Sequence, residues 1–131
     1  MNSEPLRQLV LYRLTQARET LHEAEVLRAA AAQRGAINRA YYAMSYAVLA
    51  TKQLGTSKHS GAIGLFDREF VKPGLFAADL SRALHLAFDR RQSQDYGEWI
   101  ALETGALDET LEDAQRFVDA VEVYLRAQGQ L

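Results

Sequence analysis

The chain has 131 residues, of which 48% are hydrophobic and 24% charged, a composition that suits one folded domain over residues 1–131 and argues against disorder. A formal net charge of −2 gives no bulk basic field for nucleic acid, so an RNA site would have to be a local cluster. Because cysteine, an apolar run of membrane-spanning length and a signal-peptide pattern are all missing, we expect a soluble cytoplasmic protein without disulfides or thiolate metal sites.

The first predicted element is a long amphipathic helix over residues 6–33. Its apolar positions recur at steps of three and four: Leu6, Val10, Leu14, Ala17, Leu21, Ala24 and Leu27. Gly35 is expected to end this helix, because glycine readily takes the left-handed conformation that commonly follows a helix. The short link predicts that the next helix runs back antiparallel.

A central helix is predicted over Ile37–Leu54, and it is apolar on two sides. Such a helix is usually central and buried. Its first turn nevertheless carries Asn38 and Arg39, and Arg39 projects on the side of Tyr42 and Tyr46. A cation on so apolar a helix needs a partner or a wet cleft, which makes this stretch the main functional clue.

A shorter helix is predicted next, with Thr56 or Ser57 as its N-cap and a stop at residues 72–74, Lys-Pro-Gly. One face of this helix carries four residues: His59, Ile63, Phe66 and Phe70. The short helix is expected to close one end of the bundle.

A fourth helix is predicted over residues 77–92, followed by a turn at 93–97. Its inner positions step by four, three and four along Leu80, Leu84, Ala87 and Arg91. Arg91 therefore projects from the apolar face, whereas Arg90 points sideways.

A last helix is predicted over residues 104–128, after a short apolar link that contains Trp99 and Ile100. No stretch alternates with period two for long enough to form a strand. The sequence therefore predicts an all-α fold, an up-and-down four-helix bundle with an additional short helix.

Two arginines, Arg39 and Arg91, stand on otherwise apolar faces, and two interpretations are open. Each arginine forms an internal salt bridge, for example with Asp95, or the two line a small anion-binding cleft, because a guanidinium fork matches phosphate geometry. In the second interpretation, nearby tyrosines such as Tyr42 and Tyr96 stack bases or donate hydrogen bonds. Simple core packing is the alternative for Tyr42.

His59 is the candidate general base, or a hydrogen-bond donor to a phosphate, because a neutral imidazole near a helix N-terminus suits either role. The alternative is a capping or core histidine. His22 and His85 are interpreted as ordinary residues. The sequence has no P-loop, no dinucleotide-binding glycine pattern and no HExxH motif, so neither a cofactor nor a metal is expected.

Four short segments together resemble the HEPN superfamily, most of all its small stand-alone bacterial and archaeal branch. They are NRAYYA at 38–43, KHSG at 58–61, FDREF at 66–70, and RQ at 91–92 followed by DYG at 95–97. The resemblance spans nearly the whole chain. Asn-Arg-x-Tyr-Tyr and the later Arg…Asp-Tyr-Gly are specific in combination.

The resemblance implies a helical bundle that dimerises and binds RNA or a nucleotide. Many members of the family are metal-independent endoribonucleases of toxin–antitoxin or defence systems, often encoded beside a minimal nucleotidyltransferase. Their catalytic signature is an arginine followed, after four to six residues, by a histidine. Arg91 matches the arginine, but Tyr96 stands five residues on. Either His59 substitutes from another helix, or the protein binds without cleaving.

Three functions therefore remain open, of which the missing histidine favours the first. The protein is an RNA- or nucleotide-binding member of a toxin–antitoxin or defence system, an endoribonuclease toxin that uses Arg91 and His59, or a non-catalytic interaction module. The expected ligand-binding residues are Asn38, Arg39, Tyr42, Asp95 and Tyr96. A homodimer is expected, with a minimal nucleotidyltransferase antitoxin as a further partner.

Overall fold

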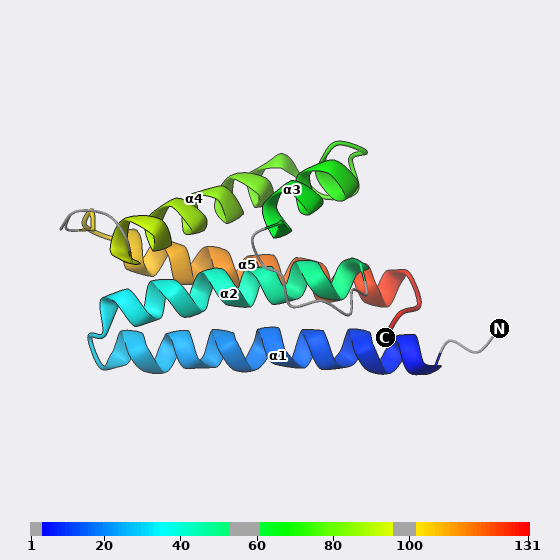
Figure 1. The fold of residues 1–131 in the computed structure, drawn as a ribbon, viewed down its shortest axis with the longest axis horizontal. Helices are drawn as coiled ribbons and strands as arrows, with labels where there is room; N and C mark the ends of the chain where they lie inside the picture. The colour runs from blue at the N-terminus through cyan, green and yellow to red at the C-terminus, as the bar shows by residue number, and fades with distance from the viewer. Residues whose placement is uncertain (1–3, 53–60, 96–101) are drawn as a thin grey trace.

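The computed structural model describes residues 4–52, 61–95 and 102–131, and every regular element in these ranges is helical. The elements are α1 (Glu4–Ala29), α2 (Gln33–Lys52), α3 (Ala62–Phe66), the π-helical η1 (Asp67–Val71), α4 (Ala78–Asp95) and α5 (Ala106–Ala127). The four long helices alternate in direction along the chain, and α3 lies beside the first part of α4 (Figure 1). The predicted all-α, up-and-down bundle with an additional short helix is confirmed.

α2 is the central helix, in contact with α1, α4 and α5. The predicted inner face is at most 2% exposed at each of Ile37, Tyr41, Met44 and Val48. Four alanines of α2 are fully buried, which lets the neighbouring helices approach closely: Ala40, Ala43, Ala47 and Ala50. One side of α2 stays partly exposed, and it carries Asn38, Arg39, Tyr42 and Tyr46.

The end of α1 differs from the prediction. The helix stops at Ala29, and Ala31, with φ of 59°, takes the left-handed position that was assigned to Gly35. The Ala32 N–H donates to the Leu27 carbonyl at 2.8 Å and the Ala31 N–H to that of Arg28 at 2.9 Å, which is a Schellman motif. Gly35 instead belongs to the first turn of α2.

Gly35 has a packing role at the contact between α1 and α2. A Cβ atom at this position would lie 3.1 Å from Cδ1 of Leu27. Glycine therefore allows the two helices to approach closely immediately after the turn. Leu6, assigned to the inner face of the first helix, is 50% exposed, so that face begins at Val10.

An aromatic cluster attaches α3 and η1 to α5. The ring of Phe66 lies 5.2 Å from that of Phe76 and 4.9 Å from that of Phe117, and Phe70 lies 5.8 Å from Tyr124. The predicted stop at residues 72–74 is confirmed by a turn in which Gly74 has φ of 86°. The proposed N-caps, Thr56 and Ser57, lie outside the described residues.

α4 is longer than predicted. Residues 93–95, expected in a turn, continue the helix to Asp95. Because the helix continues to Asp95, Arg91 and Asp95 lie one helical turn apart on the same face and form an ion pair. Tyr96 and Gly97, the rest of the predicted turn, lie outside the described residues. No helix in the described ranges is both long and apolar enough to cross a membrane.

Candidate functional site

Five of the predicted site residues come together where α2 passes the end of α4. Asn38, Arg39 and Tyr42 come from α2, and Arg91 and Asp95 come from α4. We call these five residues the arginine–tyrosine cluster. All five side chains are partly exposed, so the cluster lies at the surface of the bundle rather than in its core.

Two guanidinium groups of the cluster contact the ring of Tyr42. Cζ of Arg39 is 5.3 Å from the centroid of the Tyr42 ring, and Cζ of Arg91 is 5.1 Å from it. Arg91 also lies 5.5 Å from the ring centroid of the buried Tyr41. These are cation–π contacts, each of which contributes about 0.5–2 kcal/mol depending on how far the cation is desolvated. One aromatic ring thus contacts two positive charges from different helices.

Asn38 connects the two helices through its amide group. Its Oδ1 accepts hydrogen bonds from Nε and Nη2 of Arg39 at 3.1 and 2.9 Å. Its Nδ2 donates to Oδ2 of Asp95 at 3.4 Å, and the same oxygen lies 3.4 Å from Nε of Arg91. Asn38 therefore fixes the orientation of one guanidinium directly and holds the carboxylate that faces the other.

The two ion pairs that join described residues of the cluster to acidic side chains are long. Nη1 of Arg39 lies 3.6 Å from Oε1 of Glu23 on α1, and Arg91 lies 3.4 Å from Asp95. Among the ion pairs between described residues these two are the longest, whereas Arg18 holds its acidic partners on α5 at 2.6 and 2.7 Å. A phosphate that makes charge-assisted hydrogen bonds of about 2.7–2.9 Å would compete well with such long pairs.

Each arginine has an acidic partner, as the first interpretation expects, and the two differ in exposure. Arg91 has the predicted internal partner, Asp95, and its side chain is only 13% exposed. Arg39 is more open, with 31% of its side chain exposed, and its partner Glu23 is 56% exposed. A guanidinium has five N–H donors, so the two hydrogen bonds to Asn38 leave further donors on Arg39.

The hydroxyl of Tyr41, beside the cluster, is not ionised at physiological pH. Burial raises the pKa of the neighbouring Tyr41 hydroxyl above its usual value, against the smaller opposing effects of Ser45 and Arg91. Tyr41 is therefore neutral at physiological pH. Asp95 accepts from Asn38 and faces Arg91. With two guanidinium groups, the cluster has the chemistry of an anion-binding site.

His59 and Tyr96, which complete the predicted site, lie outside the described residues. Two members of the surroundings were missed by sequence reasoning: Glu23, which pairs with Arg39, and Tyr41, which packs against Arg91. The sequence did offer a signal for Tyr41, because it directly precedes Tyr42, which was already a candidate. Glu23 gave none, because it comes from another helix and an ordinary acidic face.

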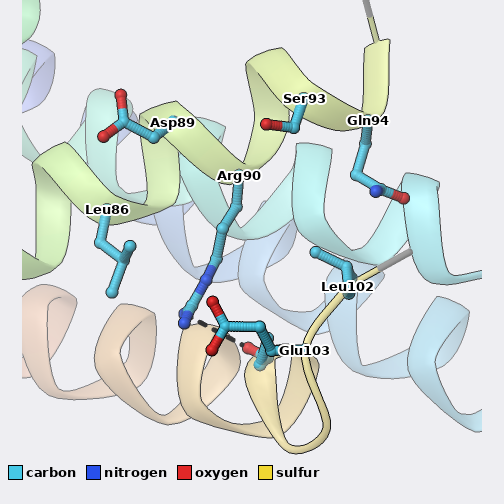
Figure 2. Close-up of a pocket in the computed structure, with 8 residues that line it drawn as sticks. Leu86, Asp89, Arg90, Ser93, Gln94, Leu102 and Glu103 are labelled. Carbon is cyan, nitrogen blue, oxygen red and sulfur yellow. Dashed lines mark hydrogen bonds between the residues drawn. The ribbon is translucent and has the colours of Figure 1, made fainter. Parts of the chain in front are cut away.

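Arg90 has a different environment from its neighbour Arg91. It reaches from α4 to the start of α5, where Nη1 donates to Oγ1 of Thr110 at 2.9 Å and Nη2 donates to Oε1 of Glu109 at 2.8 Å. Figure 2 shows it in a small cavity of about 190 Å³ on this side of α4. The cavity is lined by Leu86, Asp89, Arg90, Ser93, Gln94, Leu102, Glu103 and Ala106. Arg90 joins two helices, and both ends of its guanidinium are engaged.

No group of three or more His, Asp or Glu side chains within the described ranges is arranged to hold a metal ion.

Comparison with known proteins gives one family and several relatives. A sequence model of the HEPN domain matches residues 10–124. A UPF0332 protein of Thermotoga maritima is 37% identical over 117 residues, which cover 87% of this chain and 89% of that protein. Two proteins of Methanocaldococcus jannaschii, each named "Putative toxin", are 31% identical over 93 residues and 32% identical over 113 residues. These alignments cover 69% and 84% of this chain, and 63% and 84% of the respective relatives.

Proposed function

Because this chain belongs to the HEPN domain family and is similar to proteins named as toxins, we propose that it is the toxin of a toxin–antitoxin pair and binds RNA or a nucleotide. The ligand-binding site in this proposal is the arginine–tyrosine cluster. One observation carries it: two guanidinium groups from different helices lie within about 5 Å of one partly exposed tyrosine ring. Cations beside an aromatic face match a phosphate joined to a base.

Each residue of the cluster has a role in this proposal. Arg39, the more exposed guanidinium, makes the first contact with phosphate, and Arg91 supplies a second, better fixed charge. Tyr42 stacks against a base when one of the guanidinium groups moves from its ring to the phosphate. Asn38 orients Arg39, and Asp95 balances Arg91 while no ligand is bound. With a net charge of −2, the protein fits a nucleotide or a single-stranded end better than a long duplex.

The partners belong to the same proposal. We place one HEPN domain over residues 1–131 in the cytoplasm, as a homodimer, with a minimal nucleotidyltransferase as its antitoxin. Co-expression and affinity purification with such a neighbour-encoded protein test the pairing, and light scattering after gel filtration tests the dimer.

Binding of a labelled single-stranded oligoribonucleotide and of AMP tests the site. Arg39→Gln and Arg91→Gln should each weaken oligonucleotide binding about tenfold and lower the salt dependence by about one phosphate contact. AMP, in parallel, tells whether a single nucleotide suffices. Arg116→Gln is the matched control, because Arg116 forms two ion pairs on the exposed side of α5 and should leave affinity unchanged.

Two results would refute the proposed site. Wild-type protein that binds neither probe at micromolar concentration is one. Equal losses in Arg39→Gln, Arg91→Gln and Arg116→Gln are the other, because they would indicate only a general electrostatic attraction.

A further inference from the structure

One face of α4 carries a stripe of solvent-accessible side chains next to the cavity at Arg90. Four residues at steps of four, three and four share this face, and we call them the α4 stripe: Arg82, Leu86, Asp89 and Ser93. Leu86 is 38% exposed, and Arg82 and Asp89 are exposed as well. Three of the four, Leu86, Asp89 and Ser93, also line the cavity (Figure 2). Steps of three and four form the seam along which two helices pack.

The two charges of the α4 stripe have no partner in the part of the chain that the structure describes. Neither Arg82 nor Asp89 forms a hydrogen bond or an ion pair with a described residue. They are seven residues apart, about 10.5 Å along the helix axis, so they do not pair with each other. Arg90 of the same helix, in contrast, holds Glu109 at 2.8 Å. The stripe therefore offers one free cation and one free carboxylate on the same face.

The cavity beside the stripe suits a cation that is carried on an aliphatic stem. It has a volume of about 190 Å³, and its apolar walls come from three residues: Leu86, Leu102 and Ala106. Asp89 and Glu103 contribute carboxylates, and Glu103 likewise has no ion pair with a described residue. Arg90 does not neutralise them, because its guanidinium is engaged by α5. Arginine and lysine bury their stems along apolar surface in this way and keep the charged end among polar groups.

These features are complementary to a second copy of the same stripe. When two α4 helices pack antiparallel about a twofold axis beside Leu86, Arg82 of each copy lies opposite Asp89 of the other. The two Leu86 side chains then meet near the axis. Because a twofold interface contains each contact twice, both ion pairs form together. The free cation of one copy thus faces the carboxylate-lined cavity of the other.

We infer that the α4 stripe is the dimer interface of this protein, with Arg82 of each copy in the α4–α5 cavity of the other. This inference rests on the homodimer of the proposed function and assigns its surface. Arg91 follows Leu86 by five residues, about 140° around the helix, so the interface leaves each arginine–tyrosine cluster accessible. A contact made mainly by one pair of helices is smaller than the usual interface of about 1,600 Å², so we expect a reversible dimer with a dissociation constant in the micromolar range.

The first test is sedimentation equilibrium of the full-length protein at about 1–500 μM, a range that brackets such a dissociation constant. Arg82→Asp places two carboxylates opposite each other at both ends of the interface, and Asp89→Arg does the same with two guanidinium groups. Like charges in direct contact are strongly unfavourable, so each variant should raise the dissociation constant of the dimer at least about 100-fold.

Mixing the two variants is the decisive experiment. In a dimer of one Arg82→Asp chain and one Asp89→Arg chain, both charge pairs are again of opposite sign. An equimolar mixture of two monomeric variants should therefore dimerise, with a dissociation constant within about tenfold of wild type. Loss of folding or a change at a distant surface would not produce this recovery, because only residues that face each other across the interface can compensate.

Glu19→Arg is the matched control. Glu19 is an exposed carboxylate of α1 without an ion pair to a described residue, and α1 lies on the opposite side of the bundle from α4 (Figure 1). This variant should dimerise within about twofold of wild type. Thermal unfolding of every variant checks that the fold is kept.

Three outcomes would overturn the inference. Wild-type protein that stays monomeric over the whole concentration range refutes both the interface and the proposed homodimer. A wild-type dimer that Arg82→Asp and Asp89→Arg leave intact refutes the interface alone, because the dimer then uses another surface. Variants that are each monomeric but do not dimerise when mixed show that Arg82 and Asp89 do not face each other. Binding of RNA at the arginine–tyrosine cluster is measured separately and is expected to be the same in both variants.

Discussion

Asp95→Asn is the change that most directly tests whether a phosphate binds between Arg39 and Arg91. Oδ2 of Asp95 lies 3.4 Å from Nε of Arg91, so the carboxylate occupies part of the space around the guanidinium. A bound phosphate would stand close to that carboxylate and be repelled by it. Asparagine keeps the shape and an oxygen for the Asn38 amide, and it removes only the negative charge.

The expected effect is tighter binding. With about 6 Å between the carboxylate and a phosphate, the repulsion is about 0.7 kcal/mol in bulk water and about 2.8 kcal/mol at an effective dielectric constant of about 20. The side chain of Asp95 is 19% exposed, which places the site between these limits. We therefore expect affinity for a short single-stranded RNA to rise by about tenfold, within a range of about 3- to 100-fold.

The same change should destabilise the free protein. Loss of a partly buried, charge-assisted contact costs about 1–2 kcal/mol in the free energy of unfolding, which urea denaturation would measure. Fluorescence anisotropy at fixed ionic strength measures the affinity. Weaker binding by Asp95→Asn would mean that the carboxylate itself contacts the ligand. An unchanged affinity would show that the phosphate binds elsewhere, and either result refutes the reasoning.

Two predictions concern stability. Ala31→Gly should raise the free energy of unfolding by about 1 kcal/mol, because Ala31 has φ of 59° and glycine takes this conformation without the strain of a Cβ atom. Ala29→Gly, at the last residue of α1, is the control, and it should lower stability by up to about 1 kcal/mol in the same thermal or urea unfolding experiment. Hydrogen bonds, first from Arg18 and then from Arg126, lower the pKa of Glu122. The stability that this carboxylate contributes is therefore present above its unfolded-state pKa, and it is lost as the pH falls through the lower folded-state pKa. Glu122→Gln should therefore make stability less dependent on pH between about 5 and 3, and an unchanged pH profile would contradict this role.

Much of the fold follows from local sequence because helix formation and helix faces depend on residues only three or four positions apart. Steps of three and four predicted the long helices and the inner position of Arg91. The two-sided apolar pattern of residues 37–54 predicted the buried central helix. Where local rules failed, packing was the reason. Glycine commonly ends a helix, but Gly35 lies inside α2, where the lack of a side chain leaves room for Leu27, and Ala31 takes the left-handed conformation instead.

The arrangement of the site depended on how the helices are rotated and aligned against one another, which periodicity does not encode. The sequence by itself indicated that Arg39 and Arg91 were unusual, because each is a cation on an apolar face. Only the tertiary structure brought Arg91 to the ring of Tyr42, which Arg39 also contacts, and placed Glu23 at Arg39.

The same limit applies to His85, which by sequence was an ordinary residue beside an apolar stripe. Its partner Asp67 is 18 residues away and reaches it through packing of η1 on α4. The sequence thus indicated which side chains could carry chemistry, and only the fold decided which of them are in contact. Contacts between helices depend on how whole helix surfaces cross one another.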